Sequence, residues 1–243
     1  MKAAYGSVLG TAVAISLALA CSGCQTTAEK SAELKKLQKH EALAVRGVSV
    51  SSENPSVKVL YSVVVGSQEG TTAIVVDMRN TSSHALQLAP IEVTAKDMRG
   101  NVVYQNTGPG LQPSLTSVSL LEPGRDTVWV DDQVQATGVA TTATALVGEA
   151  KVASKIPKLT VSGAHLSEEV GSQIESGSVA NPSSQTQQDL VVYAVARKGS
   201  KVVAAGRAVL PEVAAGATAP FQIYFVGDPR GAHIGVSAPP TTF

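Results

Sequence analysis

The residue types that most often do chemistry are present in this 243-residue chain, but they are not spaced for it. The histidines occur in no HxH, HxxxH or HExxH spacing, so no local pattern predicts a histidine metal site. No Gly-x-Ser-x-Gly elbow, P-loop or Gly-x-Gly-x-x-Gly turn occurs either. We therefore expect a protein that is not an enzyme, with no catalytic residue, no cofactor and no metal site. Its four histidines are His40, His84, His165 and His233.

Two pairs of adjacent carboxylates are the remaining candidates for a metal site. Asp131-Asp132 follows Trp129-Val130, and Glu168-Glu169 lies in a polar stretch. Clustered carboxylates suit a hard cation such as calcium, and the aspartate pair is the better candidate. Adjacent residues on a strand point to opposite faces, however, which favours an ordinary strand end at Asp131-Asp132. We expect solvated side chains at Glu168-Glu169, and Trp129 as a core residue.

Both cysteines of the chain lie near its N-terminus, at the end of an apolar segment. Residues 1–20 read MKAAYGSVLGTAVAISLALA, with one cation before a run that carries no charge. This is the pattern of an export signal, and the run is short for a retained membrane span. The stretch that follows, Leu19-Ala20-Cys21-Ser22-Gly23-Cys24, resembles the lipobox of bacterial lipoproteins, in which a cysteine after small residues is acylated.

Either cysteine can be the acylated one. Ser22 and Gly23 are the small residues expected before Cys24, but Cys21 stands where a leucine is usual. Ala20 is suitable before Cys21, whereas Leu19 is bulky. We favour Cys24, with Cys21 as the alternative, which gives a signal peptide at 1–23 and a lipidated N-terminus and tether at 24–47. A diacylglyceryl group would hold the protein stably on a membrane.

The composition of the chain argues against one class of partner, the nucleic acids. Lys+Arg (19) equals Asp+Glu (19), and only 4% of residues are aromatic, so we expect no nucleic-acid partner. No cysteine follows Cys24, so packing without disulfides must hold the exported part together.

After a polar tether at 25–46 that can form a short helix, the sequence is typical of an all-β protein. The pattern predicts strands separated by Gly, Pro and Asn turns, with no further helix. The ranges are 57–65, 71–78, 91–96, 101–104, 117–121, 126–130, 142–147, 158–161, 173–179, 189–196, 201–209, 219–226 and 233–237.

The two halves of this region resemble each other in order and spacing. Asn80-Thr81-Ser82-Ser83 matches Asn181-Pro182-Ser183-Ser184, and Leu121-Glu122-Pro123-Gly124 matches Val213-Ala214-Ala215-Gly216. Trp129 then matches Phe221 as the aromatic residue of the next strand. We predict two tandem antiparallel β-sandwich domains, at 48–152 and 158–243.

The second half is similar to the bacterial FxLYD family of Ig-like domains. The similarity extends from Val179 to Val226 and includes the stretch from Leu190 to Gly199. The family's Phe-x-Leu-Tyr-Asp string is replaced here by Leu190-Val191-Val192-Tyr193-Ala194. The resemblance implies an Ig-like fold and carries no catalytic residue to this chain.

These observations favour a lipid-anchored protein of the bacterial cell envelope on the extracytoplasmic side. We expect a non-enzymatic binding or structural module whose partner is a protein or an envelope polymer. The alternative is an envelope assembly factor, or chaperone, that binds a client through a sheet edge.

Overall fold

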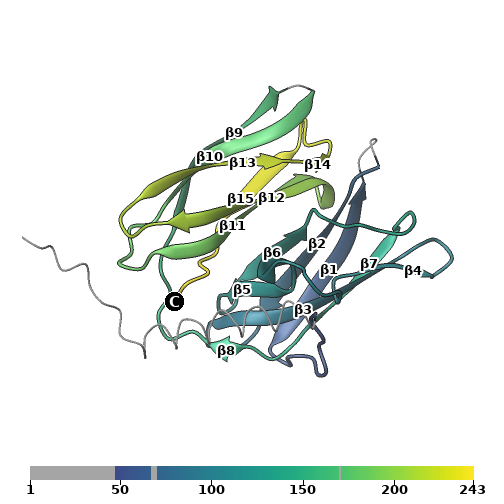
Figure 1. Ribbon diagram of the computed structural model, residues 1–243, viewed down its shortest axis with the longest axis horizontal. Helices are drawn as coiled ribbons and strands as arrows, with labels where there is room; N and C mark the ends of the chain where they lie inside the picture. The colour runs from purple at the N-terminus through teal and green to yellow at the C-terminus, as the bar shows by residue number, and fades with distance from the viewer. Residues whose placement is uncertain (1–46, 67–69, 170) are drawn as a thin grey trace, which may run out of the picture. The chain divides into compact units, whose positions relative to one another are not determined.

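The described part of the protein is built from antiparallel β-sheets (Figure 1). The computed structural model describes residues 47–66, 70–169 and 171–243, so Cys21, Cys24, His40 and the tether lie outside the described residues. Within these ranges there is no α-helix and one short 3-10 turn, Pro113–Leu115. The all-β prediction is confirmed. No helix of the described ranges is long and apolar enough to cross a membrane.

The strands of the first half form two sheets. One contains β1 (Val57–Gly66), β2 (Thr72–Asn80) and β6 (Asp126–Asp131), in the order β1-β2-β6. The other is arranged around β3 (Leu86–Lys96), which pairs with four strands. These are β4 (Val102–Gln105), β5 (Ser117–Leu121), β7 (Thr142–Val147) and β8 (Lys151–Val152).

The strands of the second half also form two sheets. The outer sheet has the order β13-β10-β9, from β9 (Thr160–Glu169), β10 (Ser172–Ala180) and β13 (Thr218–Tyr224). The inner sheet has the order β14-β12-β11-β15. Its strands are β11 (Gln187–Lys198), β12 (Lys201–Val213), β14 (Val226–Gly227) and β15 (His233–Ser237).

The two halves repeat the same local structure around Asn80 and Asn181. Each asparagine is buried, and its amide nitrogen donates to the carbonyl oxygen four residues later, at 2.7 Å in Asn80 and 2.8 Å in Asn181. Each also donates to the end of a neighbouring strand, at Leu121 and Val213. The matched tetrapeptides therefore mark equivalent turns.

The repeat extends into strand register and backbone conformation. Trp129 pairs with the residue four before Asn80, and Phe221 pairs with the residue four before Asn181, so the two aromatics are equivalent. Eight residues after each asparagine, Leu88 (φ 52°) and Asp189 (φ 48°) adopt the left-handed conformation at a break in the ladder. Leucine and aspartate, which are chemically unrelated, thus occupy equivalent bulges in the two halves.

The sheets of the two halves also pack on each other. Strand β2 is buried on both faces, as is the middle of β11, where Leu190 to Ala196 are all buried. One hydrophobic core includes Val65, Val75 and Val130 together with Val195 and Ala205. Gly47 to Phe243 accordingly belong to one compact unit. Continuous apolar runs, rather than alternating ones, are what burial on both faces produces.

Strand positions follow the sequence pattern closely, but β8 is not among the predicted strands, β12 runs to Val213 beyond the predicted end at residue 209, and three further strands differ. β3 begins at Leu86 instead of residue 91, because the strand continues through the bulge and through Pro90. β9 extends to Glu169 although only 158–161 is predicted, because its exposed edge position leaves little hydrophobic alternation. The predicted strand 219–226 is divided, since β13 ends at Tyr224 and β14 begins at Val226.

Candidate functional site

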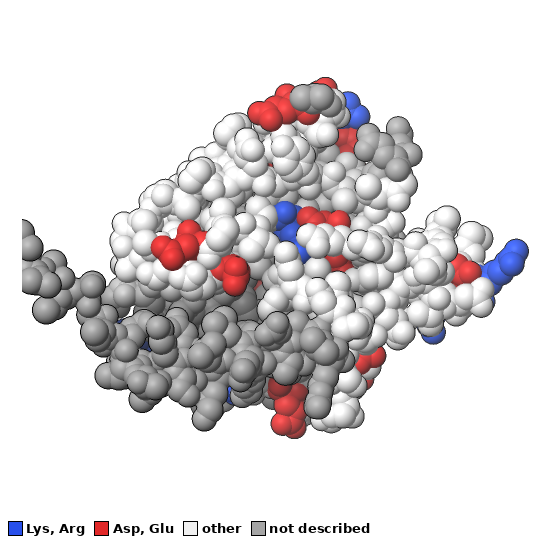
Figure 2. All heavy atoms as spheres, in the orientation of Figure 1, with Lys and Arg blue, Asp and Glu red and all other residues white. Residues whose placement is uncertain are grey.

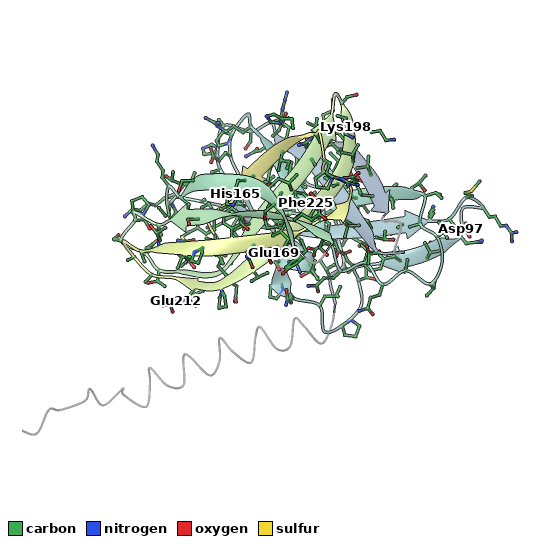
Figure 3. The ribbon with its side chains drawn as sticks, turned by 90° about the horizontal axis from the view of Figure 1, so that it is seen from above. Asp97, His165, Glu169, Lys198, Glu212 and Phe225 are labelled. Atoms are coloured by element: carbon green, nitrogen blue, oxygen red, sulfur yellow. The ribbon has the colours of Figure 1, made fainter. Side chains whose placement is uncertain are left out.

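The polar residues singled out by the sequence do not converge on one site. His84 lies in the turn after β2 against Ser83, His165 lies on the exposed β9 strand, and His233 begins β15. Figure 3 shows His165 and Glu169 far from Asp97, which lies at the β3–β4 turn. The described ranges contain no group of three or more His, Cys, Asp or Glu that could hold a metal ion.

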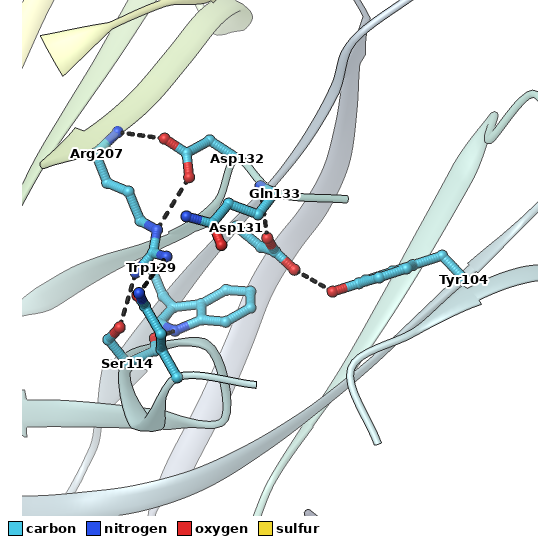
Figure 4. A network of polar contacts seen from close by, with 8 residues as sticks. Tyr104, Ser114, Trp129, Asp131, Asp132, Gln133 and Arg207 are labelled. Carbon is cyan, nitrogen blue, oxygen red and sulfur yellow. Dashed lines mark hydrogen bonds and ion pairs between the residues drawn. The ribbon is translucent and has the colours of Figure 1, made fainter. Parts of the chain in front are cut away.

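Asp131 and Asp132 do mark an important position, but each carboxylate already has protein partners (Figure 4). They leave the end of β6 in opposite directions. Asp131 accepts hydrogen bonds from the Tyr104 hydroxyl and from the backbone amide of Gln133. Asp132 accepts from Arg207 of the second half. Because adjacent side chains at a strand end point to opposite faces, the two carboxylates bind different partners and do not form one site.

Arg207 links the two halves through a buried network. Its Nε donates to Asp132 Oδ1 at 3.0 Å, and its backbone amide donates to Oδ2 at 3.0 Å. The remaining guanidinium nitrogens donate to Ser114 and Gln112 in the loop before β5. The Arg207 side chain is 2% exposed, so its charge is almost completely removed from water. Removing one partner of such a pair would be strongly destabilising, because it would leave a buried charge alone.

A second ion pair joins the same two sheets. Arg197 Nη2 donates to the Tyr61 hydroxyl at 2.8 Å and lies 3.4 Å from Asp77 Oδ2. Arg197 and Arg207 lie on β11 and β12, whereas Asp77 and Tyr61 lie on β2 and β1. Both arginines of the interface therefore come from the second half, and both aspartates from the first.

Burial shifts the pKa of the acidic groups at this interface. Desolvation raises the pKa of Asp131, and the hydrogen bond from Tyr104 acts in the opposite direction. Desolvation also raises the pKa of Asp77, opposed by the Tyr61 hydrogen bond and by Arg197. Burial raises the pKa of Tyr104, and the neighbouring Asp131 charge raises it further. These shifts reflect structural burial as readily as function.

A half-open groove of about 610 Å³ lies beside this interface. One wall comes from Arg125 to Val128 at the start of β6, and another from Gly235 to Ser237 of β15. Tyr193, Val195 and Arg197 of β11, the strand next to β15, lie on the same wall as Gly235 and Ser237. The segments Ile156–Leu159 and Ala238–Pro240 complete the lining. Its mixture of apolar surface with a few polar groups is what a binding site requires.

On the face of the molecule that Figure 2 shows, charged side chains form a few small groups on a mostly uncharged surface. Within the groove, Glu122 pairs with Arg125 at 3.3 Å, and Asp126 pairs with Arg79 at 2.5 Å. In the part of the chain that the structure describes, no ion pair includes Lys158, which also lines the groove. The groove therefore contains a cation that its own carboxylates do not neutralise.

Sequence reasoning missed the groove and both interface arginines. The signal for the interface was present in the uninterrupted apolar run from Leu190 to Ala196, which indicates a strand buried on two faces. Arg197 follows that run directly, and Arg207 pairs with Tyr193 inside the sheet. No local motif indicates which carboxylates these arginines meet, because the pairs join residues that are far apart in sequence.

The chain matches no protein-family model and no curated protein.

Proposed function

We propose that the chain is a lipid-anchored protein of the bacterial cell envelope, facing the extracytoplasmic side, which binds a partner without catalysing a reaction. The partner is a protein or an envelope polymer, and Cys24 is the acylated residue, with Cys21 as the alternative. The groove between β6 and β15 is the observation that carries the binding role. The export-type segment and the paired cysteines at its end support the anchor.

The anchor is tested by lipid labelling. Cells expressing the full chain are grown with an alkyne fatty acid, and the protein is examined for label, intact mass and detergent partitioning. We expect Cys24→Ala to lose the label or to shift processing to Cys21, and the double alanine variant to be released from the membrane. A double variant that stays fully membrane-bound would contradict the anchor.

The binding role is tested by site-specific photo-crosslinking in intact cells. A photoreactive residue at Ser237 faces the groove, whereas one at Thr218, an exposed position on β13, does not. We expect a discrete crosslinked species from position 237 and none from position 218. Equal crosslinking at the two positions would argue against a binding site in the groove.

A second candidate function is an envelope assembly factor that receives a client strand. It is favoured by the outer edges of β6, β9, β13 and β15, each of which pairs with a single strand within the described ranges. Unpaired strand edges are templates for an incoming strand. Rescue of a misassembled envelope client by the intact chain, and not by a groove variant, would distinguish this role from simple tethering.

A further inference from the structure

The groove occupies the position of a missing strand. The β1-β2-β6 sheet has three strands, and the sheet that faces it, β14-β12-β11-β15, has four. Strand β6 packs against β11 and β12, whereas β15 lies beyond β11. A fourth strand beside β6 would therefore face β15, in the space that the groove occupies.

The N-terminal residues of β6 present the strand edge that an added strand would pair with. Within the described ranges β6 pairs only with β2, and Asp126, Thr127 and Val128 line the groove. The C-terminal residues of β6 are buried, and the indole nitrogen of Trp129 donates to the Ser114 carbonyl there. The accessible edge is thus short and suits a run of about four residues at 3.3 Å per residue.

The facing wall accepts side chains from an added strand. Gly235 pairs with Val195, so a side chain on Gly235 would point to the same face as Val195, into the groove. A Cβ built at Gly235 meets nothing closer than 4.0 Å, which leaves room for an apolar side chain of a ligand. Tyr193 is 3% exposed and lines this wall, and burial raises the pKa of its hydroxyl.

We propose that a short extended segment of a partner protein, apolar on one face and acidic on the other, binds in this groove as a fourth strand beside β6. Its apolar side chains lie against Val195 and Gly235, and its carboxylates pair with Lys158, which also lines the groove. This inference rests on the binding role proposed above and names the class of its partner.

The test uses the full lipidated protein in detergent micelles and two fluorescein-labelled octapeptides. One alternates valine and glutamate, and the other alternates valine and lysine. We expect anisotropy to show saturable binding of the glutamate peptide and weaker binding of the lysine peptide. Amide hydrogen exchange should show new protection at Asp126–Val128. Absence of saturable binding, or binding without protection there, would overturn the strand addition.

Two variants with matched controls locate the site. Gly235→Leu fills the groove and should weaken binding of the glutamate peptide by about tenfold or more. Gly66→Leu is the control, because Gly66 also lies in a strand with open space at its Cβ position, but outside the groove. Lys158→Glu should reverse the preference between the two peptides. Unchanged binding in Gly235→Leu would overturn the proposal.

The proposed function and this inference can fail separately. If photo-crosslinking from Ser237 succeeds while neither peptide protects β6, the chain binds through the groove by another mode. If Ser237 gives no crosslink while the peptide protects β6, the edge is competent and the binding role in cells is wrong.

Discussion

At the scale of single residues, two buried asparagines hold turns and strand ends together by hydrogen bonds, in a region of the sequence that contains no cysteine. Asn181 Nδ2 donates to Gln185, Val213 and Ala214, and its Oδ1 accepts from Ser183. In the first half, Asn80 Nδ2 donates to His84 and Leu121, and its Oδ1 accepts from Ser82. Each side chain fixes a turn and the end of a distant strand together, so it closes one end of its sandwich.

We expect Asn181→Ala to lower the free energy of unfolding by about 2–3 kcal/mol, because it leaves buried carbonyl groups without donors. Asn80→Ala should cost a similar amount. Asn101→Ala is the control, since its side chain is exposed and bonds only to Asp97, and it should change stability by no more than about 0.5 kcal/mol. Urea unfolding measures all three, and equal losses would contradict the capping role.

The buried carboxyl group of Asp131 makes stability depend on pH, and the sign follows from its raised pKa. Because burial raises its folded-state pKa above the unfolded value, the folded state binds more protons once the pH exceeds that unfolded value. The free energy of unfolding therefore falls as the pH rises through the folded pKa. We expect Asp131→Asn to show a smaller fall between about pH 4.5 and 7.5 than the wild type, in urea titrations.

The control for this experiment is Asp228→Asn. Its hydrogen bond with Arg230 lowers the pKa of Asp228 to about 2, so its contribution is lost only at more acidic pH. The slope between pH 4.5 and 7.5 should therefore match the wild type. The same slope in Asp131→Asn and the wild type would show that Asp131 does not titrate in this range.

At the scale of elements, the bulge of β3 carries a residue poorly suited to its backbone. Leu88 has a φ of 52° and is 50% exposed, so its side chain contributes little packing against this strain. Asparagine tolerates the left-handed region better than leucine does. We expect Leu88→Asn to raise the free energy of unfolding by about 0.5–1 kcal/mol.

Val102→Asn is the matched control, because Val102 is equally exposed, at 50%, and lies in β4 without a positive φ. Asparagine is unfavourable in a strand, so this change should lower stability. Thermal unfolding of both variants decides the matter. A loss of stability in Leu88→Asn comparable with that in Val102→Asn would contradict strain at the bulge.

The elements also show how far the sequence predicts the structure. Ser117–Leu121, Thr142–Val147 and His233–Ser237 coincide with the predicted strands, because clear alternation between turns reports local burial. The bulge at Leu88 and Asp189 was not predictable, since leucine and aspartate share no preference that marks it. The groove depends on a strand count in two facing sheets, and the sequence contains no local sign of that. The cysteine prediction remains a prediction.

At the scale of the whole compact unit, the two halves share a core and are expected to unfold together. Val75 and Val130 of the first half lie in the same core as Val195 and Ala205 of the second. The Arg207–Asp132 pair crosses the same interface and would be exposed if either half unfolded alone. Separation would uncover apolar surface on both sheets, with a cost proportional to the area exposed.

Trp129 is the only tryptophan and lies in the first half, so its fluorescence reports there on a change made in the second half. Phe221 is buried in the separate core between β13 and the inner sheet, so Phe221→Ala should cost about 3–5 kcal/mol there. If the halves are coupled, the urea midpoint reported by Trp129 fluorescence should fall with it and coincide with the far-ultraviolet circular dichroism midpoint. Gln222→Ala, at the next and exposed position, should leave both midpoints nearly unchanged.

A Trp129 midpoint that stays at the wild-type value while circular dichroism reports an earlier transition would mean that the first half folds independently. The interface would then be a docking surface between two autonomous domains, and the arginine pairs would orient those domains without joining their stability.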